Sequence, residues 1–344
     1  MIGCQDIISE HLANIYNESK NKHIFPNELK LADVIPIHKK DETTILKNYR
    51  PVSLLPVVSK LFERQMYENI MNYFEKFLSP YLFGYRKGYS TEQCLIIMLE
   101  QWKKALDSKG TAGAVLTDLS KAFDCLNHNL LLAKLAAYGF DKHSLLFIQN
   151  YLKNRKQRTK INRSFSIWLE LKYGVPQGSI LGPLLFNIFI NDMFFFIKDT
   201  KIANYADDNS LYAMEDSTEK LLKTLERETT VVLNWFRLNE MKPNDDKSHL
   251  IVCNQDNLSV TLGKEKITSD KIVELLGIKI DNNLKFTSHV TELIKKGNSK
   301  LHALARISKY LKEDKLKILM KTFIQSQFNY SPLVWAFRSR TQDK

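Results

Sequence analysis

Residues 202–213 read IANYADDNSLYA, in which the adjacent acids Asp207 and Asp208 stand between two short runs that favour β-strands. This pattern predicts a β-hairpin with carboxylates at its turn. No Lys or Arg lies nearer in the sequence than Lys201, so we expect a hard divalent cation to neutralise the two acids. A solvated turn is the alternative, because Asp is common in turns for conformational reasons alone.

A second acidic position follows the apolar run 112–117, which we expect to be a buried strand ending at Asp118. A carboxylate at the end of a buried strand is costly unless it is paired or metal-bound. Asp118 is therefore the second candidate metal ligand. For Asp124 we expect a local role, as a turn former or cap before a helix that begins near Asn127.

The composition indicates a globular protein with an anionic partner. Its 344 residues exceed the usual size of a single core, so we expect two or three lobes. Lys and Arg exceed Asp and Glu by 50 − 38 = 12, which suggests nucleic acid as the partner. We find no signal peptide and no apolar run of membrane-spanning length, and so expect a soluble intracellular protein, with its compartment undetermined.

The cysteines and the helical patterns give further expectations. The four cysteines are scattered without metal-binding spacing, which favours free thiols. Helical periodicity predicts these helices: 6–19, 58–77, 92–106, 126–137, 143–152, 180–193, 218–237, 289–310 and 314–326. Residues 275–280 read as one strand with a glycine at a close approach.

Two basic segments are candidates for binding phosphate. The predicted strands 31–38 and 48–55 are joined by a turn with Lys39 and Lys40, and the second strand carries Arg50. The loop 84–91 combines glycines, aromatic residues and cations such as Arg86, as expected along a nucleic-acid strand. Solvated surface loops are the alternative in both cases.

A third basic segment, residues 153–163, is a predicted strand with six cations. Its alternative is a solvated edge strand, because Lys commonly protects exposed edges. We expect the returning strand 164–173 to pack inward through Trp168 and Leu169.

These motifs, taken in order, resemble the reverse transcriptase family, and most closely the polymerases of non-LTR (LINE-type) retrotransposons. The blocks are NYRPVSLL at 48–55, GYRKGYST at 84–91, KAFD at 121–124, VPQGSILGPLLF at 175–186 and YADD at 205–208, together with segments 244–248 and 276–278. The resemblance covers residues 20–330.

The resemblance implies an α+β fold, the right-hand polymerase architecture with an antiparallel-sheet palm, fingers and a partial helical thumb. It implies an N-terminal helical extension at 1–19, fingers and palm at 20–284, and the start of a thumb at 285–344. We expect this thumb to be truncated and the chain to be a fragment of a longer element. The implied reaction is RNA-directed DNA polymerisation, with an RNA template, a DNA primer and dNTPs as partners and no membrane.

By this resemblance Asp118, Asp207 and Asp208 are the catalytic carboxylates and, with the backbone carbonyl of Leu119, the ligands of two Mg²⁺ ions, with Mn²⁺ as an alternative. Such ion pairs bracket the attacking and leaving oxygens of phosphoryl transfer.

The resemblance also gives nucleotide-binding residues. Arg50 and one of Lys39 or Lys40 would hold the triphosphate, and Lys247 would neutralise pyrophosphate. Phe123 would crowd the sugar 2′ carbon, with a plain core position as its alternative.

The remaining implied residues contact the template and primer. Gln177 and Gly178 would form the turn beside the nucleotide and template, although a helix-entry turn is the reading from pattern alone. Arg86, Leu276 and Gly277 would contact the primer and template.

Two other functions stay open at this point. A catalytically inactive descendant that only binds RNA could retain all three acids. An RNA-dependent RNA polymerase shares the metal-binding carboxylates, but it would usually need a polar group to recognise the ribose 2′-hydroxyl, which Phe123 lacks.

Overall fold

The computed structural model describes residues 5–39, 41–119, 122–243, 248–263 and 265–336, with side chains from residue 8 onward, and the chain forms two compact units. The first unit consists of Met1–Ser79, Leu119–Phe194 and Trp235–Lys242. The second consists of Pro80–Asp118, Phe195–Asn234 and Pro243–Lys344. Each unit is described by itself below.

A five-stranded mixed sheet organises the first unit. Its strands are β1 (Leu31–His38), β2 (Tyr49–Leu54), β4 (Lys156–Ile161), β5 (Ser164–Phe165) and β6 (Leu169–Glu170). Strand β1 pairs antiparallel with β2 and parallel with β4, and β4 in turn pairs with β5 and β6. The predicted hairpin that carries Arg50 is therefore confirmed, with Arg50 opposite Ile37.

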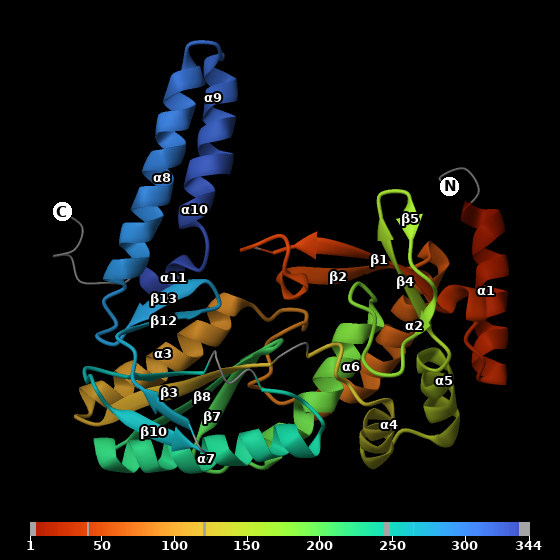
Figure 1. The fold of residues 1–344 in the computed structure, drawn as a ribbon, viewed down its shortest axis with the longest axis horizontal. Coiled ribbons are helices and arrows are strands. Elements are labelled where there is room, and N and C mark those ends of the chain that lie inside the picture. The colour runs from red at the N-terminus through yellow and green to blue at the C-terminus, as the bar shows by residue number, and fades with distance from the viewer. Residues whose placement is uncertain (1–4, 40, 120–121, 244–247, 264, 337–344) are drawn as a thin grey trace. The chain divides into compact units, whose positions relative to one another are not determined.

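The α-helices of this unit lie beside and below the sheet in the view of Figure 1: α1 (Gln5–Lys22), α2 (Val57–Phe74), α4 (His128–Ala137), α5 (Lys142–Leu152) and α6 (Leu181–Ile190). Short 3₁₀ segments lie at Asn27–Lys30, Leu46–Asn48, Glu75–Phe77 and Asn191–Phe195. The N-cap of α4 is Asn127, whose side chain accepts from the N–H groups of Asn129 and Leu130. Of the two local roles expected for Asp124, turn former or cap, the structure shows the turn, since Asp124 lies in the turn before the helix and Asn127 is the cap.

A buried carboxylate fixes the start of α6. Glu63 of α2 has no exposed surface and accepts hydrogen bonds from the N–H groups of Ile180 (2.7 Å) and Leu181 (3.4 Å). A negative charge at a helix N-terminus satisfies donors that lack partners within the helix. The hydroxyl of Tyr151 also donates to Glu63 (3.2 Å), and burial raises the pKa of that phenol.

The second unit is built on an antiparallel sheet of order β7-β8-β3-β9, covered on both faces (Figure 1). Its strands are β7 (Lys201–Tyr205), β8 (Asp208–Glu215), β3 (Thr111–Asp118) and β9 (His249–Val252). Along β3, Ala112, Ala114 and Leu116 face helix α3 (Thr91–Asp107), while Val115 faces helix α7 (Thr218–Leu238). Because β3 is buried on both faces, its residues 112–116 are all apolar or glycine.

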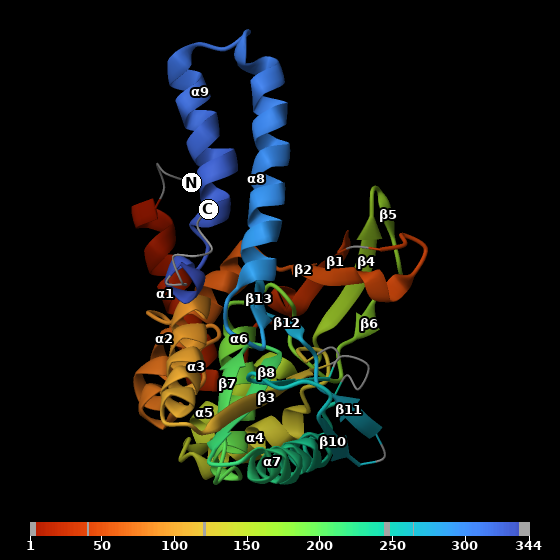
Figure 2. The ribbon, with the colours of Figure 1, turned by 90° about the vertical axis from the view of Figure 1, so that its left-hand side faces the viewer.

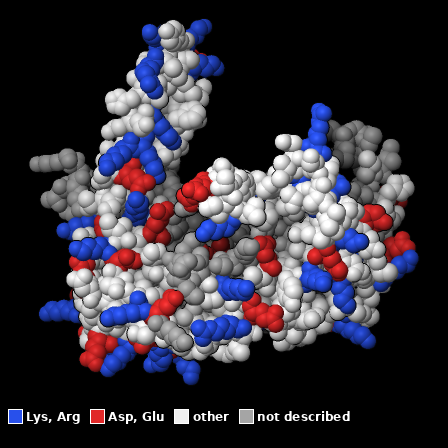
Figure 3. Space-filling model, in the orientation of Figure 1, with Lys and Arg blue, Asp and Glu red and all other residues white. Residues whose placement is uncertain are grey.

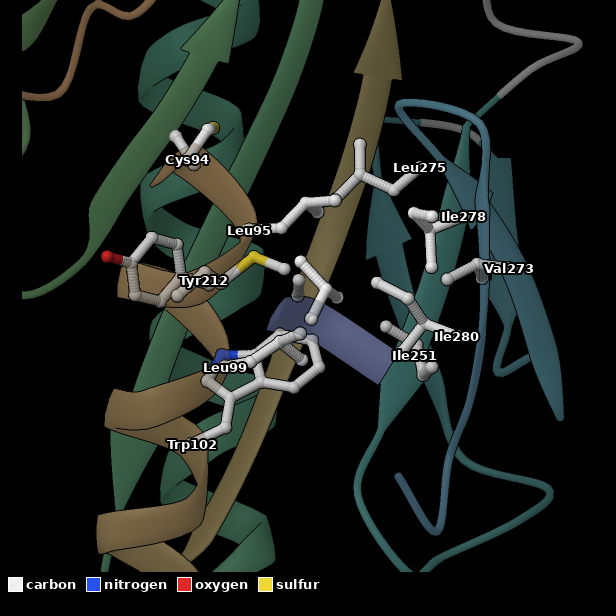
Figure 4. Close-up of a cluster of buried hydrophobic side chains, with 14 of the residues drawn as sticks. Cys94, Leu95, Leu99, Trp102, Tyr212, Ile251, Val273, Leu275, Ile278 and Ile280 are labelled. Carbon is white, nitrogen blue, oxygen red and sulfur yellow. The ribbon is translucent and has the colours of Figure 1, made fainter. Parts of the chain in front are cut away.

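Two hairpins complete the covering layers. The hairpin of β10 (Ser259–Leu262) and β11 (Glu265–Thr268) packs with α7. The hairpin of β12 (Ile272–Leu275) and β13 (Ile278–Asp281) packs with α3, where Trp102, Leu99 and Leu95 meet Ile278 and Ile280 (Figure 4).

Helices α8 (Thr287–Ser308) and α9 (Glu313–Leu319) run side by side (Figure 2). Helix α9 continues through a π-helical segment, Met320–Gln325, into α10 (Ser326–Phe328), and α11 spans Pro332–Trp335. Gly297 of α8 allows this packing, because a Cβ there would lie 3.3 Å from the ring of Phe328. None of the helices in the described parts of the chain is both long and apolar enough to cross a membrane.

Three sequence expectations were wrong. Leu276 and Gly277 do not continue a strand but form the turn between β12 and β13. The segment around β5 and β6 does not pack inward, because Trp168 is 39% exposed and Leu169 is 59% exposed. Arg155 is not a surface cation, since it is 1% exposed and lies over the ring of Tyr151.

The buried ammonium of Lys30 gives a prediction on pH and stability. Lys30 donates to Asn150 Oδ1 (2.9 Å), and burial, together with the charge of Arg155, lowers its pKa from 10.5 to about 8. The cost of burying this charge is thus fully present below about pH 8 and is relieved as the pH rises to 10.5. We expect Lys30→Met to be more stable than the parent at pH 7, by on the order of 1–3 kcal/mol, and this advantage to shrink between pH 8 and 10.5.

Urea unfolding across this pH range measures the difference. The matched control is Lys47→Met at an exposed position, for which we expect no such change with pH. A Lys30→Met advantage that is constant from pH 7 to 10.5 would contradict the assignment.

Candidate active site

The two adjacent aspartates lie at the hairpin turn that the sequence predicts. Strands β7 and β8 pair antiparallel, with Tyr205 opposite Asp208, so that Ala206 and Asp207 form a two-residue turn. Ala206 has a φ of 59°. A positive φ at the first turn residue is the feature of type II′ turns, whose twist matches that of the flanking strands. Asp207 and Asp208 are both exposed.

Asp118 lies opposite Asp208 across the pairing of β3 with β8. Residues directly opposite in an antiparallel pair have Cα atoms ~4.5–5.5 Å apart and project their side chains from the same face. That face is the one covered by α3, since Ala114 and Leu116 of β3 and Tyr212 of β8 lie on it. The register thus sets Asp118 opposite Asp208, and the convergence of all three carboxylates, including that of Asp207, stays a prediction.

The negative charge of Asp208 affects the pKa of a neighbouring thiol. Cys94 of α3 is buried, and burial, followed by the negative charge of Asp208, raises its pKa to about 12. Cys94 is therefore a neutral thiol at the edge of the site.

The acids supply oxygen ligands of the kind that hard divalent cations take. Asp118 is half-buried and Asp208 is exposed opposite it, with Asp207 next in the chain. Within the described ranges, no group of three or more His, Cys, Asp or Glu side chains is arranged to hold a metal ion. Carboxylate oxygens are nevertheless the donor type that suits a divalent cation, and the strand register sets two of the three carboxylates, those of Asp118 and Asp208, opposite each other. Leu119 is buried directly after β3, and its role as a carbonyl ligand stays a prediction.

Two buried asparagines hold the acidic turn, and the sequence analysis missed both. Asn204 has no exposed surface, and its Nδ2 donates to the carbonyl of Ala206 (2.9 Å) and to Asn209 Oδ1 (2.9 Å). Asn209, 3% exposed, donates from Nδ2 to the carbonyl of Asp207 (3.1 Å). The available signal was the presence of an amide on each side of the turn within otherwise apolar strands.

A second segment supports the turn from behind. The N–H of Phe83 donates to the carbonyl of Asn204 (2.9 Å), and the N–H of Asn204 donates to the carbonyl of Tyr81 (3.1 Å). A Cβ at Gly84 would lie 2.4 Å from the backbone nitrogen of Ala206. Only glycine permits this approach, so the loop predicted to contact nucleic acid also supports the acidic turn.

Arg86 of the same loop folds onto its own segment. Its Nη1 donates to the carbonyl of Leu82 (3.1 Å), and its guanidinium lies 4.1 Å from the ring centre of Tyr89. Contact of Arg86 with a primer or template stays a prediction.

Two of the predicted phosphate-binding residues, Arg50 and Lys39, lie at one end of the β1–β2 hairpin in the first unit. Arg50 is exposed on β2, and Lys39 is exposed where its N–H donates to the carbonyl of Asn48 (2.8 Å). Lys40 and Lys247 lie outside the described residues.

Phe123, Gln177 and Gly178 are held together in the first unit. Phe123 is half-buried and stacks on Phe186 with ring centres 4.9 Å apart, and its carbonyl accepts from the N–H of Val175 (3.0 Å). Gln177 donates from Nε2 to Asp124 Oδ1 (3.0 Å). Phe123 is thus partly a packing residue and partly exposed.

The turn at Gly178 packs tightly on β2. The N–H of Ser53 donates to the carbonyl of Gln177 (2.8 Å). Gly178 has a φ of 122°, and a Cβ there would lie 2.8 Å from the carbonyl oxygen of Ser53. Glycine is therefore required at this position for both conformation and space.

Leu276 and Gly277, predicted to contact the primer, form a hairpin turn in the second unit. Both have positive φ, 49° and 78°, as in type I′ turns. The hydroxyl of Tyr330 donates to the carbonyl of Leu276 (2.7 Å) and to Thr91 Oγ1 (3.3 Å). The turn is thereby tied to the segment that follows α10.

The sequence matches one family model, described as reverse transcriptase (RNA-dependent DNA polymerase), over residues 37–280. Among curated proteins, it is 29% identical over 296 residues to the probable RNA-directed DNA polymerase from transposon BS of Drosophila melanogaster. It is 28% identical over 297 residues to the RNA-directed DNA polymerase from mobile element jockey of the same species. These matches cover 81% and 83% of this chain but 32% of each relative, so the chain spans about a third of their length.

Solved structures give the same result for the fold. The apo telomerase of Candida tropicalis truncated from its C-terminal domain matches with a TM-score of 0.53 and 13% identity, covering 75% of this chain and 54% of that chain. The same species' telomerase in complex with a fragment of telomeric RNA matches with a TM-score of 0.53, covering 96% and 58%. With the helices and antiparallel sheets described above, these likenesses confirm the predicted α+β polymerase fold.

The asparagine pair leads to a prediction. Asn204→Ala removes the three hydrogen bonds that its amide donates, to the carbonyls of Ala206 and Asp208 and to Asn209 Oδ1. We expect a loss of ~1–3 kcal/mol in the free energy of unfolding, and faster amide hydrogen exchange at residues 205–209.

The matched control is Asn239→Ala, which removes another buried amide that donates to the carbonyl of Trp235 (2.9 Å). This variant should lose stability without a local change in exchange at 205–209. Unchanged exchange at these residues in Asn204→Ala would show that Asn204 does not hold the turn.

Proposed function

Because this chain belongs to the reverse transcriptase family, we propose that it is the polymerase part of a retrotransposon and extends a primer 3′-hydroxyl with dNTPs on an RNA template. The family predicted from the sequence motifs is confirmed by the match over residues 37–280. The observation that most directly supports catalysis is the register that sets Asp118 opposite Asp208.

Enzymes of this family generally depend on a divalent metal, and Asp118, Asp207, Asp208 and the carbonyl of Leu119 would hold it here. We assign two Mg²⁺ ions, with Mn²⁺ as the alternative. When bound, they would lower the pKa of the primer hydroxyl and neutralise the triphosphate. The contribution of the protein would be to hold the three carboxylates in position, because positioning and charge supply most of the catalysis in phosphoryl transfer.

The exposed cations would bind the phosphates of the nucleotide. Arg50 presents a planar fork suited to phosphate oxygens, and Lys39 or Lys40 would add a second positive charge. Lys247 is assigned to the pyrophosphate. The excess of 12 positive charges favours the polyanionic template and primer.

The sugar and base of the nucleotide would be recognised by other residues of the first unit. Phe123 would exclude ribonucleotides by bulk at the 2′ carbon. Gln177 and Gly178 would lie beside the nucleotide and template, where the absence of a Cβ at Gly178 permits close approach. In the second unit, Arg86, Leu276 and Gly277 would contact the primer and template.

We assign fingers and palm to residues 20–284 and the start of a thumb to 285–344, with 1–19 as an N-terminal extension. Helix α8 begins at Thr287, which supports the boundary between palm and thumb near residue 285.

Primer extension tests the central assignment. We expect Asp207→Asn to reduce extension of a DNA primer on an RNA template by roughly 10²–10³-fold, the range found when a single charge-stabilising group is removed. The matched control is Asp216→Asn, which changes an exposed acid just after β8 and should retain activity.

Full activity of Asp207→Asn would reject the metal site. A wild-type chain that binds RNA but never extends a primer would support the inactive RNA-binding alternative.

Sugar selection tests the role of Phe123. We expect Phe123→Ala to lower the ratio of kcat/KM for dNTPs over rNTPs by at least about tenfold, since removing bulk in a pocket changes selection by roughly 10- to 200-fold. Phe195→Ala, at an exposed position, is the control. Because Phe123 stacks on Phe186, thermal unfolding should accompany the kinetics. An unchanged ratio in a folded variant would leave Phe123 as a packing residue.

A further inference from the structure

Strands β4, β5 and β6 form a surface ribbon, residues 156–170. Several large apolar side chains of this ribbon are exposed to solvent. Every residue from 161 to 170 is exposed. The large apolar side chains among them, with their exposed fractions, are Ile161 (57%), Phe165 (47%), Ile167 (77%), Trp168 (39%) and Leu169 (59%). Contiguous exposed apolar surface of this kind marks a binding surface.

Arg158 fixes the two aromatic rings of this ribbon. Its guanidinium lies 3.9 Å from the ring centre of Phe165 and 4.5 Å from that of Trp168. The Nε of Arg158 donates to Asp33 Oδ1 of β1 (2.7 Å). Arg158 is thus held by a neighbouring strand, and both rings are held by Arg158 while much of their surface remains exposed.

The backbone of the ribbon is also fixed. The N–H of Ser166 donates to the carbonyl of Thr159 (2.9 Å), and the N–H of Thr159 donates to Ser166 Oγ (2.9 Å). The rings of Phe165 and Trp168, here called the aromatic platform, are therefore held in place before any ligand binds. This lowers the entropic cost of binding.

The charge around the platform is strongly positive. From Lys153 to Lys172 the chain has six cations besides the buried Arg155, and one acid, Glu170. Within the described residues, Lys153, Lys156, Lys160 and Arg163 have no carboxylate partner. Figure 3 shows Lys and Arg side chains at the tip of this ribbon among uncharged residues.

We propose that the ribbon binds single-stranded RNA, by stacking unpaired bases on Phe165 and Trp168 and by contacts of the surrounding Lys and Arg side chains with phosphates. Aromatic planes within a basic groove are the common means of binding single strands, whereas the bases of a duplex are already stacked. The choice of RNA rests on the proposed function, in which the template is RNA.

A second copy of this chain fits the ribbon less well. A symmetric contact between two ribbons would bring Lys and Arg against Lys and Arg, and like charges facing each other across an interface are unfavourable. RNA supplies the opposite charge along its whole length.

The experiment measures RNA binding by the full chain without metal or dNTPs. Trp168 is exposed, whereas Trp102, Trp235 and Trp335 are buried, so stacking on Trp168 should quench fluorescence when a 12-nucleotide oligouridylate is added. By anisotropy of a labelled oligonucleotide, we expect Phe165→Ala and Trp168→Ala each to raise Kd by roughly 5- to 150-fold, and Trp168→Phe to retain most of the affinity.

The controls separate the ribbon from general charge and from other surfaces. Phe195→Ala removes an equally large exposed ring elsewhere and should leave Kd unchanged. Arg163→Ala should weaken binding and reduce the slope of log Kd against log salt by about 0.7, as expected for one phosphate contact on a single strand. Duplex RNA of the same length should show no loss of affinity from the ring substitutions, and single-stranded DNA tests the preference for RNA.

Unchanged Kd in both ring variants would overturn the proposal. So would a wild-type dimer that the ring substitutions dissociate without any change in RNA affinity, because the ribbon would then be an interface between copies. Carrying out the binding on Asp207→Asn keeps the result independent of polymerisation. RNA binding that depends on the rings, together with a wild-type chain that does not extend a primer, would support the ribbon and reject the proposed reaction.

Discussion

The pairing of β3 with β8 is the constraint on which the site depends. It sets Asp118 opposite Asp208 at one end of a sheet that is covered on both faces. Moving this register by one residue would turn one of the two acids to the other face of the sheet. Ala112, Ala114 and Leu116 would then also exchange faces with Val115, so the apolar packing under α3 and α7 fixes the register for the acids.

The turn with Asp207 needs a different kind of support, because two exposed acids in sequence repel each other. Asn204 and Asn209 hold the carbonyls of Ala206 and Asp207 with neutral amides. A Lys or Arg in their place would compete with a metal for the carboxylates, and a further Asp or Glu would add to the repulsion. An amide donates and accepts without adding charge, which suits a turn whose acids must remain available.

Patterns within the sequence were sufficient for the elements but not for their tertiary contacts. Alternation and turn chemistry predicted the β7–β8 hairpin and the end of β3 at Asp118, and helical periodicity predicted α2, α3 and α5 to within a few residues. Lys30 could not be recognised as buried, because its partner Asn150 lies 120 residues away in the sequence. Arg155 lies only four residues from Tyr151, whose ring it contacts, but it stands within a segment of six cations that was predicted to be a basic strand. Trp168 was expected inside because of its apolar character, whereas its position is set by the contact of Arg158, which Asp33 of β1 holds in place.

Two turns, one in each unit, are fixed by opposite electrostatic means, and this difference follows from the charges that each turn carries. The turn at Gln177 and Gly178 leads into α6, whose free N–H groups attract negative charge, and the buried carboxylate of Glu63 binds them. The same device at the turn of β7 and β8 would place another anion beside Asp207 and Asp208. A buried carboxylate is therefore suited to the turn without acids, and buried amides are suited to the turn with them.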